Sequence, residues 1–154
     1  MLNNETLFSF ILASVLLFGC TTNSQVVPND HGNDTQFTTI STNQATDQKI
    51  SNQAKEKLSA DENIIHVKAA NSKKHLALAF EVPHLKRFQL QKIKKQVKDD
   101  LKREFPKMKV EVSTDQKIIL ELERLEEQLQ TDSLSEKKLN KEMKRIIGLM
   151  KEQT

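Results

Sequence analysis

The stretch Asn63–Val82, NIIHVKAANSKKHLALAFEV, decides the fold of this chain. Its second half alternates large and small apolar residues, which is typical of a β-strand with one bulky face. The bulky face would carry Leu76, Leu78, Phe80 and Val82, and the other face Ala77 and Ala79. The first half alternates in the same way through Ile65, Val67 and Ala69. Because Asn71-Ser72-Lys73 has the composition of a turn, we predict that the two strands form a hairpin.

A helix and a third strand are predicted after the hairpin. Pro83 ends the second strand and suits the start of a helix. The segment His84–Phe105 then carries apolar residues at helical spacing, at Leu90, Ile93, Val97 and Leu101. Pro106 ends this helix, and Lys107–Val112 alternates as a strand does. Because a helix joins the second and third strands, we expect these strands to be parallel.

Further helices are predicted on both sides of this unit. Ile50, Ala54 and Leu58 recur every four residues before the first strand. Ser113-Thr114-Asp115-Gln116 has the form of a capping box, and Ser133-Leu134-Ser135-Glu136 repeats the signal. The two helices that follow have apolar stripes at Ile118, Leu122, Leu125 and Leu129, and at Leu139, Met143, Ile146 and Met150. We therefore predict an α+β fold, an αββαβ core with two C-terminal helices, in which helices cover one face of a three-stranded mixed sheet.

The amino-terminal segment predicts a lipid anchor. The apolar run Leu7–Phe18 is about a dozen residues long, too short to span ~30 Å of hydrocarbon but typical of a signal-peptide core. Leu17-Phe18-Gly19-Cys20 follows the order of a lipoprotein cleavage site, so residues 1–19 would be removed and Cys20 acylated. An uncleaved anchor and ordinary secretion are the alternatives. The start MLNNETL departs from a usual signal because it has no Lys or Arg.

The rest of the amino-terminal part is predicted to be a spacer. Cys20 is the only cysteine among the 154 residues, so no internal disulfide forms. Residues 21–47 are rich in Thr, Asn, Gln and Asp and have few apolar side chains, which is typical of a disordered tether. Such a tether spans roughly 30 Å. We therefore divide the chain into a signal peptide (1–19), a lipidated cysteine with its tether (20–47) and a folded domain (48–154) outside the cytosol.

Basic residues concentrate in the segment His84–Phe105, although the formal net charge of the chain is only +3. They are Lys86, Arg87, Lys92, Lys94, Lys95, Lys98, Lys102 and Arg103. Only Asp99, Asp100 and Glu104 oppose them. This surface would bind anionic lipid headgroups at ~1 kcal/mol per well-placed charge. The alternatives are a solvated helix face, or neutralisation by the acidic helix that carries Glu121, Glu123, Glu126 and Glu127.

The start of this basic helix has two interpretations. Leu85 and Phe88 would pack against the domain and hold the helix start, with Lys86 and Arg87 pointing outward. Binding of a partner by the same residues is the alternative.

No motif for catalysis or metal binding stands out. The histidines His31, His66, His75 and His84 have no i, i+4 helical spacing. A metal site between His66 and His75 across the hairpin is an alternative to two partly exposed histidines. There is no glycine-rich phosphate loop and no G-x-S-x-G, and Ser113 is explained as a cap. We therefore expect no enzyme activity, cofactor or metal, and no nucleic-acid partner because export would separate the chain from it.

The chain resembles a known family over about Asn63–Thr154 and at the lipoprotein cleavage site. The run VPHLKRFQLQKIKKQVKDDLKREFPKMKVEVSTDQKIILELERL at 82–125, with the tail KEMKRIIGLMKEQT, is similar to the YhcN/YlaJ sporulation lipoproteins, and within them to the YlaJ branch. The most specific parts are His84-Leu85-Lys86-Arg87-Phe88 and Ser113–Lys117. The resemblance implies a lipoprotein of spore membranes, linked to germination, with no catalytic activity. The element order also resembles a BON domain, an analogy of architecture alone.

These observations predict a lipid-anchored, non-enzymatic accessory protein of the spore or forespore membrane. It would support sporulation or germination through contacts with other spore membrane proteins or with anionic headgroups. The alternative is a general extracytoplasmic binding domain for anionic lipid or cell-wall polymer, unrelated to sporulation.

Overall fold

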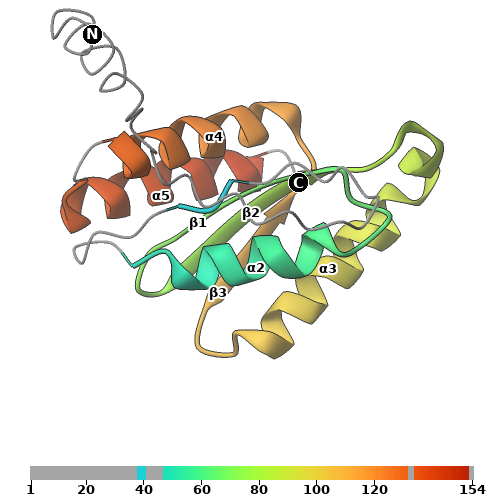
Figure 1. The fold of residues 1–154 in the computed structure, drawn as a ribbon, viewed down its shortest axis with the longest axis horizontal. Helices are drawn as coiled ribbons and strands as arrows, with labels where there is room; N and C mark the ends of the chain where they lie inside the picture. The colour runs from blue at the N-terminus through green and yellow to red at the C-terminus, as the bar shows by residue number, and fades with distance from the viewer. Residues whose placement is uncertain (1–37, 41–46, 132–133, 153–154) are drawn as a thin grey trace, which may run out of the picture. The chain divides into compact units, whose positions relative to one another are not determined.

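The computed structural model describes residues 38–40, 47–131 and 134–152, and confirms the α+β class. The signal peptide, Cys20, His31 and most of the predicted tether lie outside the described residues. In chain order the elements are α2 (Lys49–Ser59), β1 (His66–Asn71), β2 (His75–Glu81), the 3₁₀ helix η1 (His84–Gln89), α3 (Leu90–Glu104), β3 (Lys109–Ser113), α4 (Gln116–Thr131) and α5 (Glu136–Glu152) (Figure 1).

The sheet has the predicted mixed topology, in the order β1-β2-β3. β1 and β2 are antiparallel, with His66 opposite Glu81 at one end and Asn71 opposite Leu76 at the other. The turn between them is closed by Ser72, whose N–H donates to the His75 carbonyl at 2.9 Å. β2 and β3 are parallel, and the segment between them contains α3, as a parallel connection requires.

Helices cover both faces of the sheet, so the prediction that they cover one face was wrong. Figure 1 shows α2 and α3 on one side of the sheet and α4 and α5 on the other. Leu76, Leu78 and Phe80 pack with the first pair, whereas Ala77 and Ala79 pack with the second. The central strand β2 alternates bulky with small apolar residues rather than apolar with polar ones. Neither face can therefore be left in water, and the alanines let helices pack closely against the second face.

The predicted helix His84–Phe105 is two elements. Its C-terminal part, α3, buries Ile93, Val97 and Leu101 as expected. Its first six residues form η1, which buries no residue. The expectation that Leu85 and Phe88 pack against the domain was therefore wrong.

The cap of α4 differs from the predicted Ser113, whereas Ser133, in the start signal predicted for the next helix, lies outside the described residues. Ser113 is the last residue of β3, and Asp115 caps α4, because its Oδ1 accepts the N–H of Lys117 at 2.7 Å. Ser113 supports that cap, since its Oγ accepts the Asp115 N–H at 3.1 Å. Ser135 caps α5, and its Oγ lies 3.4 Å from the donating N–H of Lys138. The residue that caps a helix can thus be a neighbour of the predicted one, if its side-chain oxygen lies closer to the free N–H groups of the first turn.

The folded domain includes residues before Gln48, which corrects the predicted tether boundary. Ile40 is 2% exposed and belongs to the core under α4 and α5. Its N–H donates to Asn52 Oδ1 at 3.1 Å, and its carbonyl accepts from Asn52 Nδ2 at 2.8 Å. One isolated isoleucine in a polar stretch left no periodic pattern from which its burial could be predicted.

Candidate functional site

The basic surface consists of the eight residues predicted from the sequence, Lys86, Arg87, Lys92, Lys94, Lys95, Lys98, Lys102 and Arg103. The first two lie on η1 and the other six on α3. Because Ile93, Val97 and Leu101 turn one side of α3 into the core, the remaining positions of the helix face outward. Five of the eight are exposed, and Lys86, Lys94 and Lys98 are half-buried.

Three members of the basic surface are held in ion pairs. Lys95 Nζ lies 2.8 Å from Asp99 Oδ2, one helical turn away, and Lys98 Nζ lies 2.9 Å from Glu111 Oε2 on β3. Arg103 pairs with Asp100 on α3 itself. The hydrogen bond from Lys95 raises its own pKa and lowers the pKa of Asp99. Asp99 and Asp100 thus pair within α3, whereas Glu104 pairs with Lys57 of α2.

The other five cations, Lys86, Arg87, Lys92, Lys94 and Lys102, form no ion pair with the part of the chain that the structure describes. The alternative that the acidic helix α4 neutralises these cations does not hold among the described residues, because α4 covers the opposite face of the sheet. Glu121 instead faces Arg145 on α5 at 2.5 Å. That hydrogen bond lowers the pKa of Glu121 and raises the pKa of Arg145.

An apolar tip adjoins the basic surface. Leu85 is 83% exposed and Phe88 is 81% exposed, both on η1. In a 3₁₀ helix, residues three apart eclipse, so these two side chains lie on the same side of η1. Lys86 and Arg87 come between them in the sequence. The sequence identified this segment, but it assigned Leu85 and Phe88 to packing rather than to the surface.

A buried charged cluster was missed by the sequence reasoning. Lys55 on α2 has a fully buried side chain, and its Nζ lies 2.8 Å from Glu126 Oε1 on α4. Glu126 Oε1 also accepts the outward N–H of Ala69 on β1 at 3.0 Å. Lys68 approaches the second oxygen of Glu126 at 3.7 Å and Glu123 at 3.0 Å. Burial lowers the pKa of Lys55, and Glu126 opposes that shift.

This cluster closes the free edge of β1. Glu126 satisfies the outward N–H of Ala69, while Gln48 exchanges hydrogen bonds of 2.7 and 2.9 Å with the carbonyl and N–H of Asn71. An unpaired strand edge would otherwise invite another strand. The sequence contains a signal for this buried cluster, because Lys55 and Glu126 both lie among the buried residues of their helices, next to Ala54 and Leu125.

The histidines do not come together. His66 and His75 lie at opposite ends of the hairpin, since His66 faces Glu81 while His75 follows the turn directly. The alternative of a metal site between them is thereby excluded. Partial burial lowers the pKa of His75, and the nearby Lys109 and Lys151 lower it further. Within residues 38–40, 47–131 and 134–152, no group of three or more His, Cys, Asp or Glu side chains is placed to hold a metal ion.

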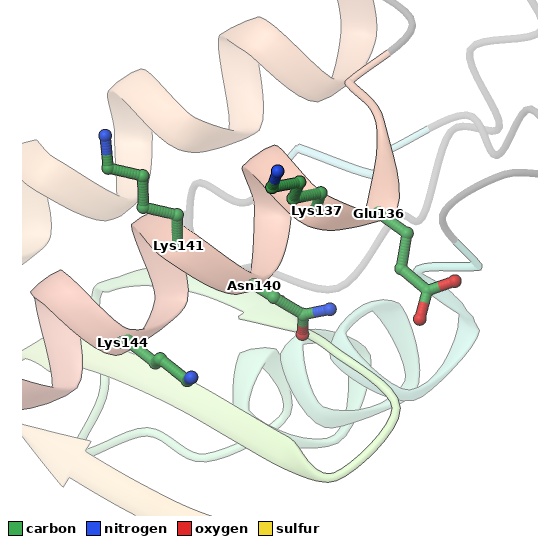
Figure 2. Close-up of a pocket in the computed structure, with 5 residues that line it drawn as sticks. All are labelled: Glu136, Lys137, Asn140, Lys141 and Lys144. Carbon is green, nitrogen blue, oxygen red and sulfur yellow. The ribbon is translucent and has the colours of Figure 1, made fainter.

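The hollow on α5 in Figure 2 is open and shallow. Its lining is Glu136, Lys137, Asn140, Lys141 and Lys144, all from one helix. Figure 2 shows that these side chains fan outward rather than converge on one point. Glu136 is engaged by Lys73 at 2.9 Å. The arrangement presents no set of groups aimed at a common ligand.

Comparisons with known proteins leave the chain without an assigned family. No family model, characterised protein or solved structure matched it significantly. Among the helices that the structure describes, none combines the length and apolar character needed to cross a bilayer.

Proposed function

We propose that this chain is a lipid-anchored, non-enzymatic accessory protein at the outer face of the spore or forespore membrane, where the basic surface contacts anionic headgroups. The observation that carries the proposal is the set of five cations, Lys86, Arg87, Lys92, Lys94 and Lys102, without an ion-pair partner among the described residues. Each would gain ~1 kcal/mol beside an anionic leaflet.

A lipid on Cys20 would keep this surface close to a bilayer. Seventeen residues separate Cys20 from Thr38, the first described residue. Even fully extended, such a segment spans at most about 60 Å. Tethering converts headgroup binding into an intramolecular event at high effective concentration, so weak individual contacts suffice. The resemblance to the YhcN/YlaJ lipoproteins is the support for placing this membrane in the spore.

Energy transfer to lipid tests the headgroup contact. The acylated full chain would carry Gln96→Cys, labelled with a donor dye, in vesicles with headgroup-linked acceptors. Gln96 is an exposed, uncharged residue on α3. We expect stronger transfer on phosphatidylglycerol-containing vesicles than on phosphatidylcholine alone, and a loss of the difference at high salt, which screens exposed charges.

Charge reversal provides a matched control. Lys92→Glu, Lys94→Glu and Lys102→Glu together should abolish the preference for anionic vesicles. Lys137→Glu, Lys141→Glu and Lys144→Glu on α5 change the net charge equally at exposed positions and should leave it intact. Equal effects of the two triple variants would refute a localised headgroup surface.

The spore assignment needs a separate test. Fractionation and crosslinking with the natively acylated protein should place it in spore membranes, with its abundance rising during sporulation. A chain made steadily in growing cells and absent from spores would instead favour the general extracytoplasmic binding domain. In that case, soluble anionic wall polymer should compete with vesicles for the basic surface.

A further inference from the structure

The tip of η1 is the most exposed apolar feature of the described residues. The other large apolar side chains with substantial exposure, Ile65 and Leu120, are 42% and 44% exposed, about half the values of Leu85 and Phe88. Scattered exposed apolar residues are ordinary, but two nearly free ones on the same side of one short helix form a protrusion. Neither contributes to the core, so stability does not explain them.

η1 is held in place by its neighbours. Pro83, in extended geometry with φ −52° and ψ 146°, turns the chain out of β2, and its carbonyl accepts the Lys86 N–H at 2.8 Å. At the other end, the Leu90 N–H donates to the Arg87 carbonyl, where α3 begins. The tip is therefore fixed between a strand and a helix, and it presents Leu85 and Phe88 in a set orientation.

The charged residues around the tip indicate which kind of surface the tip would contact. From Val82 to Lys98 the chain has six Lys or Arg residues and no Asp or Glu. Lys86 and Arg87 lie between the two apolar residues, and Lys92 follows in the first turn of α3. An apolar tip surrounded by cations is complementary to an anionic bilayer, because the hydrocarbon takes the apolar groups while phosphates meet the cations.

We propose that Leu85 and Phe88 insert between the lipids of an anionic bilayer, with Lys86 and Arg87 at the level of the headgroup phosphates. This inference rests on the proposed function, since the same basic surface brings η1 to the membrane. It adds a contact with the hydrocarbon that charge alone would not supply. Such a contact orients the domain, because the tip is at one end of α3.

Tryptophan fluorescence tests the insertion directly. The chain has no Trp and no Tyr, so Phe88→Trp introduces a single reporter. In the acylated full chain on phosphatidylglycerol-containing vesicles, its emission should shift to shorter wavelength, and brominated acyl chains should quench it. The matched control is Leu120→Trp on α4, an exposed position on the opposite side of the sheet, which should show neither change.

The outcomes separate this inference from the proposed function. Transfer from the Gln96→Cys label on anionic vesicles, without quenching of Phe88→Trp, would overturn insertion and leave the headgroup contact. Loss of both signals would overturn both proposals. Equal quenching in phosphatidylcholine alone would overturn the anionic-lipid assignment. In detergent, the emission of Phe88→Trp could shift with protein concentration while brominated acyl chains fail to quench it on vesicles. That result would show that a second copy of the chain covers the tip, and it would also overturn insertion.

Discussion

Lys55 on α2 and the lysines of α3 occupy helices that cover the same face of the sheet, yet their environments are opposite. Lys55 is fully buried and bound to Glu126, whereas Lys92 and Lys102 are exposed and unpaired among the described residues. Position along the helix does not explain the difference, because Lys55 follows the buried Ala54 just as Lys102 follows the buried Leu101. The difference arises because Glu126 of α4 reaches Lys55 beside the edge of β1, whereas no described acidic side chain pairs with Lys92 or Lys102. The role of a lysine here depends on which distant element covers it, not on its position along its own helix.

Removing the buried carboxylate is the strongest way to sharpen this comparison. Glu126→Gln keeps an oxygen that can accept the Ala69 N–H but leaves Lys55 buried without a counter-charge. We expect the free energy of unfolding to fall by about 3–5 kcal/mol in urea titrations followed by circular dichroism. The matched control, Glu127→Gln at the adjacent exposed position, should change it by less than about 0.5 kcal/mol. Similar effects of both variants would contradict a structural ion pair.

The second prediction concerns the coupling between the two partners. Lys55→Met alone leaves Glu126 buried with only Lys68 nearby, at 3.7 Å, and should destabilise by about 2–4 kcal/mol. Combined with Glu126→Gln, it removes both buried charges, so the double variant should lie within about 1 kcal/mol of the native chain. A double-mutant cycle measures the coupling, and additive losses would show that the two side chains act independently.

A smaller effect is expected where an ion pair is partly exposed. Lys98 and Glu111 join α3 to β3 at 2.9 Å, with side-chain exposures of 34% and 26%. Glu111→Gln should cost about 0.5 kcal/mol, because water screens both charges. The same urea titration at low and high salt checks it. A loss comparable to that of Glu126→Gln would break the distinction between buried and surface pairs.

The smallest expected effect is the acid sensitivity of His75. Because its pKa lies below 6.5 in the folded chain, the unfolded chain binds more protons at mildly acid pH. Its contribution to stability is therefore present above pH 6.5 and is lost as the pH falls through the folded pKa. Proton NMR should place the ring titration below 6.5, and Lys109→Gln should move it upward, while Glu111 acts in the opposite sense. A midpoint at or above 6.5 would contradict this environment.

The secondary structure was largely predictable because each element carries its own periodicity. The alternation in His75–Val82 marked β2, and the stripe Ile93, Val97 and Leu101 marked α3. The sequence also placed the eight basic residues on one segment, η1 and α3, while their binding role stays a prediction. The burial of Ile40 and the 3₁₀ geometry of η1 left no local pattern. The second helical layer was missed although both faces of β2 are apolar.

The amino-acid sequence alone determined which segments form strands and helices, their order, and the concentration of cations after Pro83. These depend on interactions between residues close in the chain, for which spacing is sufficient information. Only the tertiary structure decided that Lys55 meets Glu126 across 71 positions, and that Leu85 and Phe88 stay outside the core. A charged residue on an apolar stripe can signal burial, but no local pattern shows which distant element covers that residue.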